Sequence, residues 1–163
     1  KRTDDIEVEL VRSPDNDDGC YYVTAKPGLI ANHKEGPFDK HADKSFHLDN
    51  YCFDSNPEKD FFWKCLTDGT VDKIWFTGML THGQSEFTIA YIDPESHTLR
   101  NYYPDFLVRK KNGTYTIVEI KGEDQLDDAV VKAKKEYATQ LATDSGFTYE
   151  FIPSKQAHAG LAA

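Results

Sequence analysis

The chain has 163 residues, of which 39% are hydrophobic, so it is long enough for one domain with a substantial core. Its 28 acidic and 19 basic residues give a formal net charge of −9, which argues against a protein that wraps nucleic acid through charge alone. No apolar run approaches the ~18 residues of a membrane span and no signal peptide is recognisable, so we expect no membrane partner.

Cysteine and histidine usage gives no support for a disulfide framework or a zinc site. Cys20, Cys52 and Cys65 form no close pairs, and the six histidines never fall at HxxxH spacing. A reduced, cytoplasmic protein therefore fits best. Because the sequence starts at Lys1 without a methionine, we expect it to be part of a longer or processed protein.

Residues 1–54 are predicted to form an N-terminal extension of strands and irregular loop. Segments 5–13 and 19–26 alternate enough to be strands, and the residues between them have turn composition. The turn contains the acidic run DNDDG, but the spacing of a calcium-binding EF-hand loop is absent. Residues 26–45 are predicted to be irregular.

Residues 55–153 are predicted to form the core of the domain, followed by a tail at 154–163. A helix is expected from Ser55 or Asn56, with Pro57 in its first turn and Gly69 after its end. Strands are expected at 71–78, 85–93, 102–110 and 114–122. A second helix over 124–144, with an apolar stripe, then leads to a strand at 147–153; the stripe comprises Leu126, Val130, Ala133, Tyr137 and Leu141.

This order predicts an α/β (α+β) fold with a mixed central β-sheet flanked by helices. The second helix can serve as the crossover between two parallel strands. The pattern of core elements is αβββαβ, with the β-rich extension in front.

The Asn112-Gly113 pair predicts a hairpin, and the length of its loop decides where the nearby charges lie. A two-residue loop would place Asp105 on the opposite sheet face from Glu119 and Lys121. A three-residue loop over 111–113, with the glycine in a left-handed conformation, would place Asp105 directly opposite Glu119 and on the same face as Lys121. We favour the second register, because two facing carboxylates then have a purpose in holding a cation.

Here the residues resemble a known family. YPDF at 103–106 and EIK at 119–121 resemble the PD-(D/E)xK nuclease signature, with Asp105, Glu119 and Lys121 in its three places. Four spaced segments (SNPEKDF, YYPDFLV, TIVEIKG and KAKKEYA) more narrowly resemble the C-terminal endonuclease domain of type III restriction subunits and related helicase–nuclease proteins. The likeness covers about residues 55–153 and implies the restriction-endonuclease-like core.

Glu58 is the candidate upstream acidic residue, because it lies in the first turn of the expected helix, on the same stripe as Phe61 and Phe62. The alternative is that it only compensates the helix dipole, a role that acids commonly have at helix starts.

Asp105 and Glu119 are hard oxygen ligands that suit Mg²⁺, for which Mn²⁺ would substitute. The resemblance adds the Ile120 carbonyl as a ligand, Lys121 as the cation beside the attacking water or the phosphate, and Glu58 at a second metal or its water. Three lysines on the second helix are further candidates for phosphate contacts, although a solvated face is the simpler interpretation: Lys132, Lys134 and Lys135.

The leading hypothesis is therefore a Mg²⁺-dependent endonuclease domain acting on DNA, with a catalytically silent nucleic-acid-binding or protein-docking module as the alternative. No GxxxxGK[ST] segment occurs, so the chain is not itself an ATP motor. The type III likeness implies an upstream ATPase/helicase domain or a modification subunit as a partner.

Overall fold

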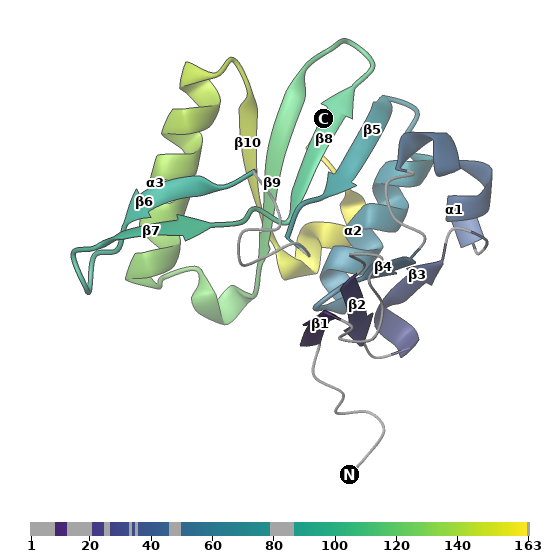
Figure 1. The fold of residues 1–163 in the computed structure, drawn as a ribbon. Coiled ribbons are helices and arrows are strands. Elements are labelled where there is room, and N and C mark those ends of the chain that lie inside the picture. The colour runs from purple at the N-terminus through teal and green to yellow at the C-terminus, as the bar shows by residue number, and fades with distance from the viewer. Residues whose placement is uncertain are drawn as a thin grey trace.

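The computed structural model describes residues 9–12, 21–24, 27–32, 34, 36–45, 50–78 and 87–162 (Figure 1). The strands are β1 (Glu9–Arg12), β2 (Tyr21–Thr24), β3 (Ile30–Asn32), β4 (Asn50–Cys52), β5 (Val71–Phe76), β6 (Ile89–Ile92), β7 (Leu99–Tyr102), β8 (Phe106–Lys110), β9 (Tyr115–Lys121) and β10 (Thr148–Pro153). The α-helices are α1 (Gly36–Lys40), α2 (Asn56–Thr67) and α3 (Ala129–Asp144). Short 3₁₀ helices cover Pro27–Leu29, Ala42–Lys44, Glu123–Gln125 and Ser154–Ala159.

The central sheet has four strands in the order β10-β9-β8-β5. β5 and β9 both pair with β8 in antiparallel fashion, whereas β10 pairs with β9 in parallel after the crossover through α3. The sheet is therefore mixed, and the α+β prediction is confirmed. Along the chain, α2, β5, β8, β9, α3 and β10 follow one another in the predicted αβββαβ order, with the β6–β7 hairpin inserted after β5 (Figure 1).

Alternation along β8 and β9 divides the core between the two faces of the sheet. Phe106 and Val118 belong to a large apolar cluster with the aromatic side chains of α2. Leu107 and Ile117 belong to a second cluster with α3 and the β6–β7 hairpin. The helices α2 and α3 therefore cover opposite faces, because adjacent residues of a strand point to opposite sides.

Segments that precede residue 54 also contribute to the first cluster. The rings of Phe38, Tyr51 and Phe53 are fully buried and pack beside Phe62 of α2. The expected strands of this region are present as β1 and β2, while the turn predicted at 13–19 lies outside the described residues. Residues 26–45, predicted to be irregular, include β3 and α1.

The β6–β7 hairpin corrects the prediction of one strand over 85–93 and another over 102–110. Ile92 pairs with Leu99, so the chain turns back within this region and forms a separate two-stranded sheet. Asp93 stabilises the turn, because its Oδ1 accepts hydrogen bonds from the backbone N–H groups of Glu95 and Ser96. Tyr102 ends β7 and β8 begins only at residue 106, after Pro104.

The helix predicted over 124–144 begins later, and a different stripe is buried. Asp128 caps α3 by accepting hydrogen bonds from the N–H groups of Val130 and Val131. Ala138 and Ala142 are buried, whereas Tyr137 and Leu141 are 38% and 40% exposed. The predicted stripe is wrong in its C-terminal half, because small alanines let the helix lie close against the sheet and the hairpin.

None of the described helices is long and apolar enough to cross a membrane.

Candidate active site

The β8–β9 turn has the three-residue loop that the sequence favoured. Lys110 donates its N–H to the carbonyl of Thr114 at 2.8 Å, and Gly113 has a φ of +88°. The strand pairing of Phe106 with Val118 continues the same register, which sets Asp105 opposite Glu119. This prediction is confirmed, and the two carboxylates share the sheet face that α3 covers.

Asp105 is held in place by the end of β5. The N–H groups of Thr77 and Gly78 both donate to its carbonyl oxygen, at 2.9 and 3.1 Å. Its Oδ2 accepts a hydrogen bond from the N–H of Ile120 at 2.8 Å. A Cβ on Gly78 would lie 3.1 Å from the Asp105 Cα and 3.2 Å from its Oδ1, so any larger residue here would have to push Asp105 aside by a few tenths of an ångström.

Glu119 is 4% exposed, and its two carboxylate oxygens differ in their surroundings. Oε1 lies 2.9 Å from the Nζ of Lys121. Oε2 is buried and accepts no hydrogen bond from the part of the chain that the structure describes. A buried carboxylate oxygen without a donor is costly, so this atom marks the place where an additional cation or donor would be stabilising.

Burial raises the affinity of the Asp105 and Glu119 carboxylates for protons. Burial, followed by the charges of Glu119 and Glu58, raises the pKa of Asp105 well above its ordinary value. Burial also raises the pKa of Glu119, although Lys121 and Lys134 oppose that shift. Burial works to lower the pKa of Lys121, but the charge of Glu119 and its hydrogen bond outweigh it, so that pKa lies above its ordinary value.

Glu58 lies in the first turn of α2 and is 8% exposed. Its Oε2 accepts the N–H of Asp54 at 3.0 Å, so it also satisfies a backbone group just before the helix. Burial and the charge of Asp54 raise the pKa of Glu58 to about 7, and Glu119 contributes in the same direction. The residue is therefore electrostatically coupled to the pair on the sheet.

Asp54, which the sequence reading did not select, is the fourth acidic side chain at this end of the sheet. Partial burial raises its pKa, while the charge of Lys121 lowers it. No motif pointed to Asp54. The sequence feature that could have identified Asp54 is its position immediately before the helix cap Ser55, within one helical turn of Glu58.

The donor set suits a hard divalent cation. No group of three or more His, Cys, Asp or Glu side chains within the described ranges is arranged to hold a metal ion as it stands. The unpartnered Oε2 of Glu119 and the raised pKa values of Glu58, Asp105 and Glu119 nevertheless all reflect negative charge without enough compensation. Carboxylate oxygens are the ligands that Mg²⁺ and Mn²⁺ prefer.

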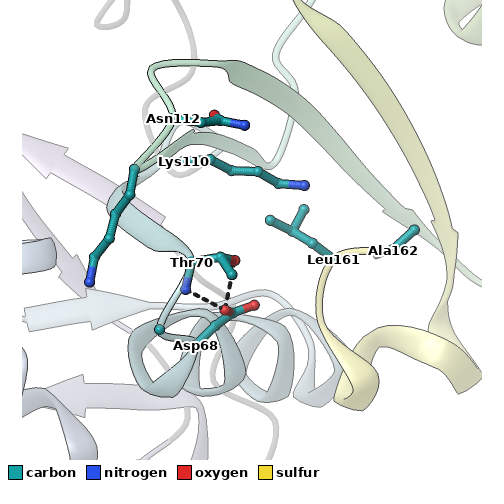
Figure 2. A pocket seen from close by; sticks show the side chains of 8 residues that line it. Asp68, Thr70, Lys110, Asn112, Leu161 and Ala162 are labelled. Atoms are coloured by element: carbon teal, nitrogen blue, oxygen red, sulfur yellow. Dashed lines mark hydrogen bonds between the residues drawn. The ribbon is translucent and has the colours of Figure 1, made fainter.

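A pocket of about 660 Å³ lies at the opposite end of the hairpin, around the β8–β9 turn (Figure 2). Its lining combines the α2–β5 connection, the turn and the C-terminal segment: Asp68, Gly69, Thr70, Lys110, Lys111, Asn112, Leu161 and Ala162. The carboxylate of Asp68 accepts hydrogen bonds from the N–H and Oγ1 of Thr70, both at 2.8 Å. Because its lining lies around the β8–β9 turn, the pocket is separate from Asp105 and Glu119 at the other end of the hairpin.

Residues 81–153 match the family model described as TnsA-like endonuclease N terminal, a family within the restriction-endonuclease-like (PD-(D/E)xK) superfamily. The match spans less than half of the chain, and it includes Asp105, Glu119 and Lys121 but not Glu58. No curated protein matches the chain. The matching family is not that of type III restriction subunits, so the narrower resemblance stays a prediction. The comparison indicates that this chain is similar to an endonuclease domain of the PD-(D/E)xK superfamily.

Proposed function

We propose that the chain is a divalent-metal-dependent endonuclease domain that hydrolyses phosphodiester bonds of DNA. The observation that carries this proposal is the pairing of Asp105 with Glu119 at one end of a hairpin, with Lys121 bonded to Glu119. The similarity of residues 81–153 to an endonuclease family supports the same reaction class.

In this proposal Asp105, Glu119 and the Ile120 carbonyl hold Mg²⁺ or Mn²⁺, and Glu58 holds a second ion or its water. A bound divalent ion supplies hydroxide near neutral pH and neutralises the phosphate. The hydrogen bond from the Ile120 N–H fixes one oxygen of Asp105, which keeps that carboxylate oriented toward Glu119.

Lys121 is the cation that this proposal places against the phosphate. Its Nζ is held by Glu119, and a quarter of its side chain is exposed, so the ammonium is positioned yet reachable by a substrate. A fixed positive charge stabilises the negative charge that develops on the phosphate during attack.

The partner proposals rest on the sequence. We propose DNA as the substrate and a larger parent protein, with an ATPase/helicase domain or a modification subunit, as the setting. The net charge of −9 fits this arrangement, because it leaves the domain few phosphate contacts of its own.

Cleavage of supercoiled plasmid DNA tests the function directly. We expect nicking or linearisation with Mg²⁺ or Mn²⁺, none with EDTA, and none by Asp105→Ala. The matched control is Asp60→Ala, which removes an exposed carboxylate from α2 and should cleave like the wild type. A wild-type protein that binds Mn²⁺ poorly and leaves the plasmid intact would support the silent docking module instead.

A further inference from the structure

Lys134 occupies an unusual place on α3. It follows Val130 by four residues and precedes the buried Ala138 by four, so it lies on the face of the helix that packs against the sheet and the hairpin. Its ammonium lies 5.6 Å from the ring centroid of Tyr91 and 5.5 Å from that of Tyr102. Both tyrosines are 4% exposed, so the charge sits over buried rings.

The ammonium of Lys134 has aromatic neighbours but no direct anionic partner among the described residues. Lys132, two positions earlier, differs in this respect, because it is 62% exposed and pairs with Asp127 at 3.3 Å. Burial and the charge of Lys121 lower the pKa of Lys134, whereas the charges of Glu119, Asp128 and Asp93, none of them an ion-pair partner, oppose that shift. Lys134 is thus within electrostatic range of both Glu119 and Lys121.

A purely structural role explains this arrangement poorly. The stem of a methionine would fill the same space beside the two tyrosine rings without desolvating a charge. A half-buried cation with no bonded anion is expensive, although the rings recover part of that cost. Its placement beside the acidic site, on the same sheet face as Asp105 and Glu119, suggests that its anion arrives from outside.

We propose that Lys134 binds a phosphate of the DNA backbone at the Asp105–Glu119 site, as a second cation next to Lys121. This inference rests on the proposed function. Tyr91 and Tyr102 hold the ammonium at the site in the absence of substrate, which reduces the side-chain entropy lost when the phosphate binds. The three lysines of α3 therefore do not share one role.

The test compares Lys134→Met with Lys132→Met and with Lys134→Arg, using supercoiled plasmid for cleavage and a fluorescein-labelled 20-base-pair duplex for binding. Lys134→Met keeps the packing against the tyrosines and should lower kcat/KM about ten- to hundredfold, as expected for one lost charge-assisted contact. Its melting temperature should stay close to that of the wild type. Lys134→Arg should retain most of the activity, and Lys132→Met should behave like the wild type.

The salt dependence of duplex binding gives a second readout. Losing one phosphate contact should reduce the slope of log K against log salt by about 0.9 for Lys134→Met and leave it unchanged for Lys132→Met. An unchanged slope, or cleavage at the wild-type rate, would overturn the inference while leaving the nuclease proposal intact. Failure of the wild type to cleave would overturn the proposed function, and the binding slopes would still decide the role of Lys134.

Discussion

Replacing Glu58 with glutamine should stabilise the metal-free protein at neutral and higher pH. Glutamine keeps an oxygen that can accept the N–H of Asp54, but it removes a charge that is buried beside Asp54 and Glu119. The folded-state pKa of about 7 lies above the ordinary value of 4.5, so the folded protein binds more protons than the unfolded chain between these values. The contribution of Glu58 to stability is therefore full below pH 4.5 and is lost as the pH rises to about 7.

The displacement from 4.5 to about 7 corresponds to about 3 kcal/mol in the free energy of unfolding at pH 8. In a domain of this size that difference shifts the melting temperature by roughly 6–12 °C. Urea unfolding in EDTA at pH 4.5, 6, 7 and 8, followed by tryptophan fluorescence, should show the wild type losing stability across this range. The difference between Glu58→Gln and wild type should grow from near zero at pH 4.5 to its full value at pH 8.

The comparison of two proteins at each pH cancels the contributions of titrating groups that do not interact with Glu58, whereas relief of its neighbours Asp54, Asp105 and Glu119 adds to the stabilisation of Glu58→Gln. Asp60→Asn, an exposed substitution on the same helix, should change stability by no more than a few tenths of a kcal/mol. Equal stability of Glu58→Gln and wild type at pH 8 in EDTA would refute the reasoning, because it would mean that the Glu58 charge costs nothing in the folded state.

Three further substitutions test how the site is held and what each residue does. Gly78→Ala should lower cleavage at least about tenfold by displacing Asp105. Its control is Gly69→Ala, which should cleave normally because the added Cβ would meet no atom within 4 Å. Equal activity of the two variants would show that Asp105 tolerates the shift. Asp105→Ala should abolish both cleavage and the rise in melting temperature that Mn²⁺ gives the wild type, and a retained rise would place the metal elsewhere. Lys121→Ala should abolish cleavage but keep the Mn²⁺ effect, because the lysine is not a metal ligand; wild-type cleavage would mean that the motif match is accidental.

The register of the hairpin was predictable because two local signals agreed. Gly113 adopts the left-handed conformation that a three-residue loop requires, and the expectation that Asp105 and Glu119 face each other favoured the same register. The parallel pairing of β9 and β10 followed from the helix between them. Each inference needed only neighbouring residues, which is why sequence alone sufficed.

The predictions that failed depended on distant neighbours. The large side chains of Tyr137 and Leu141 looked like a core stripe, but aromatic residues of the β6–β7 hairpin already fill the surface opposite this part of α3, which leaves space for the small side chains of Ala138 and Ala142. Gly78 was overlooked for the same reason. A glycine at the end of a strand signals close backbone approach, but the sequence does not say that the approaching residue is Asp105.

The packing beneath the site explains why its charges stay close together. Phe106, next to Asp105, is fully buried, and its ring centroid lies 5.1 Å from that of Phe61 and 5.1 Å from that of Phe76. A close-packed aromatic cluster resists displacement of the strands that carry the carboxylates. Because this packing holds Asp105 opposite Glu119, a bound proton or a bound cation would relieve the repulsion between the two carboxylates. The raised pKa values and the proposed metal affinity are thus two consequences of the same rigid arrangement.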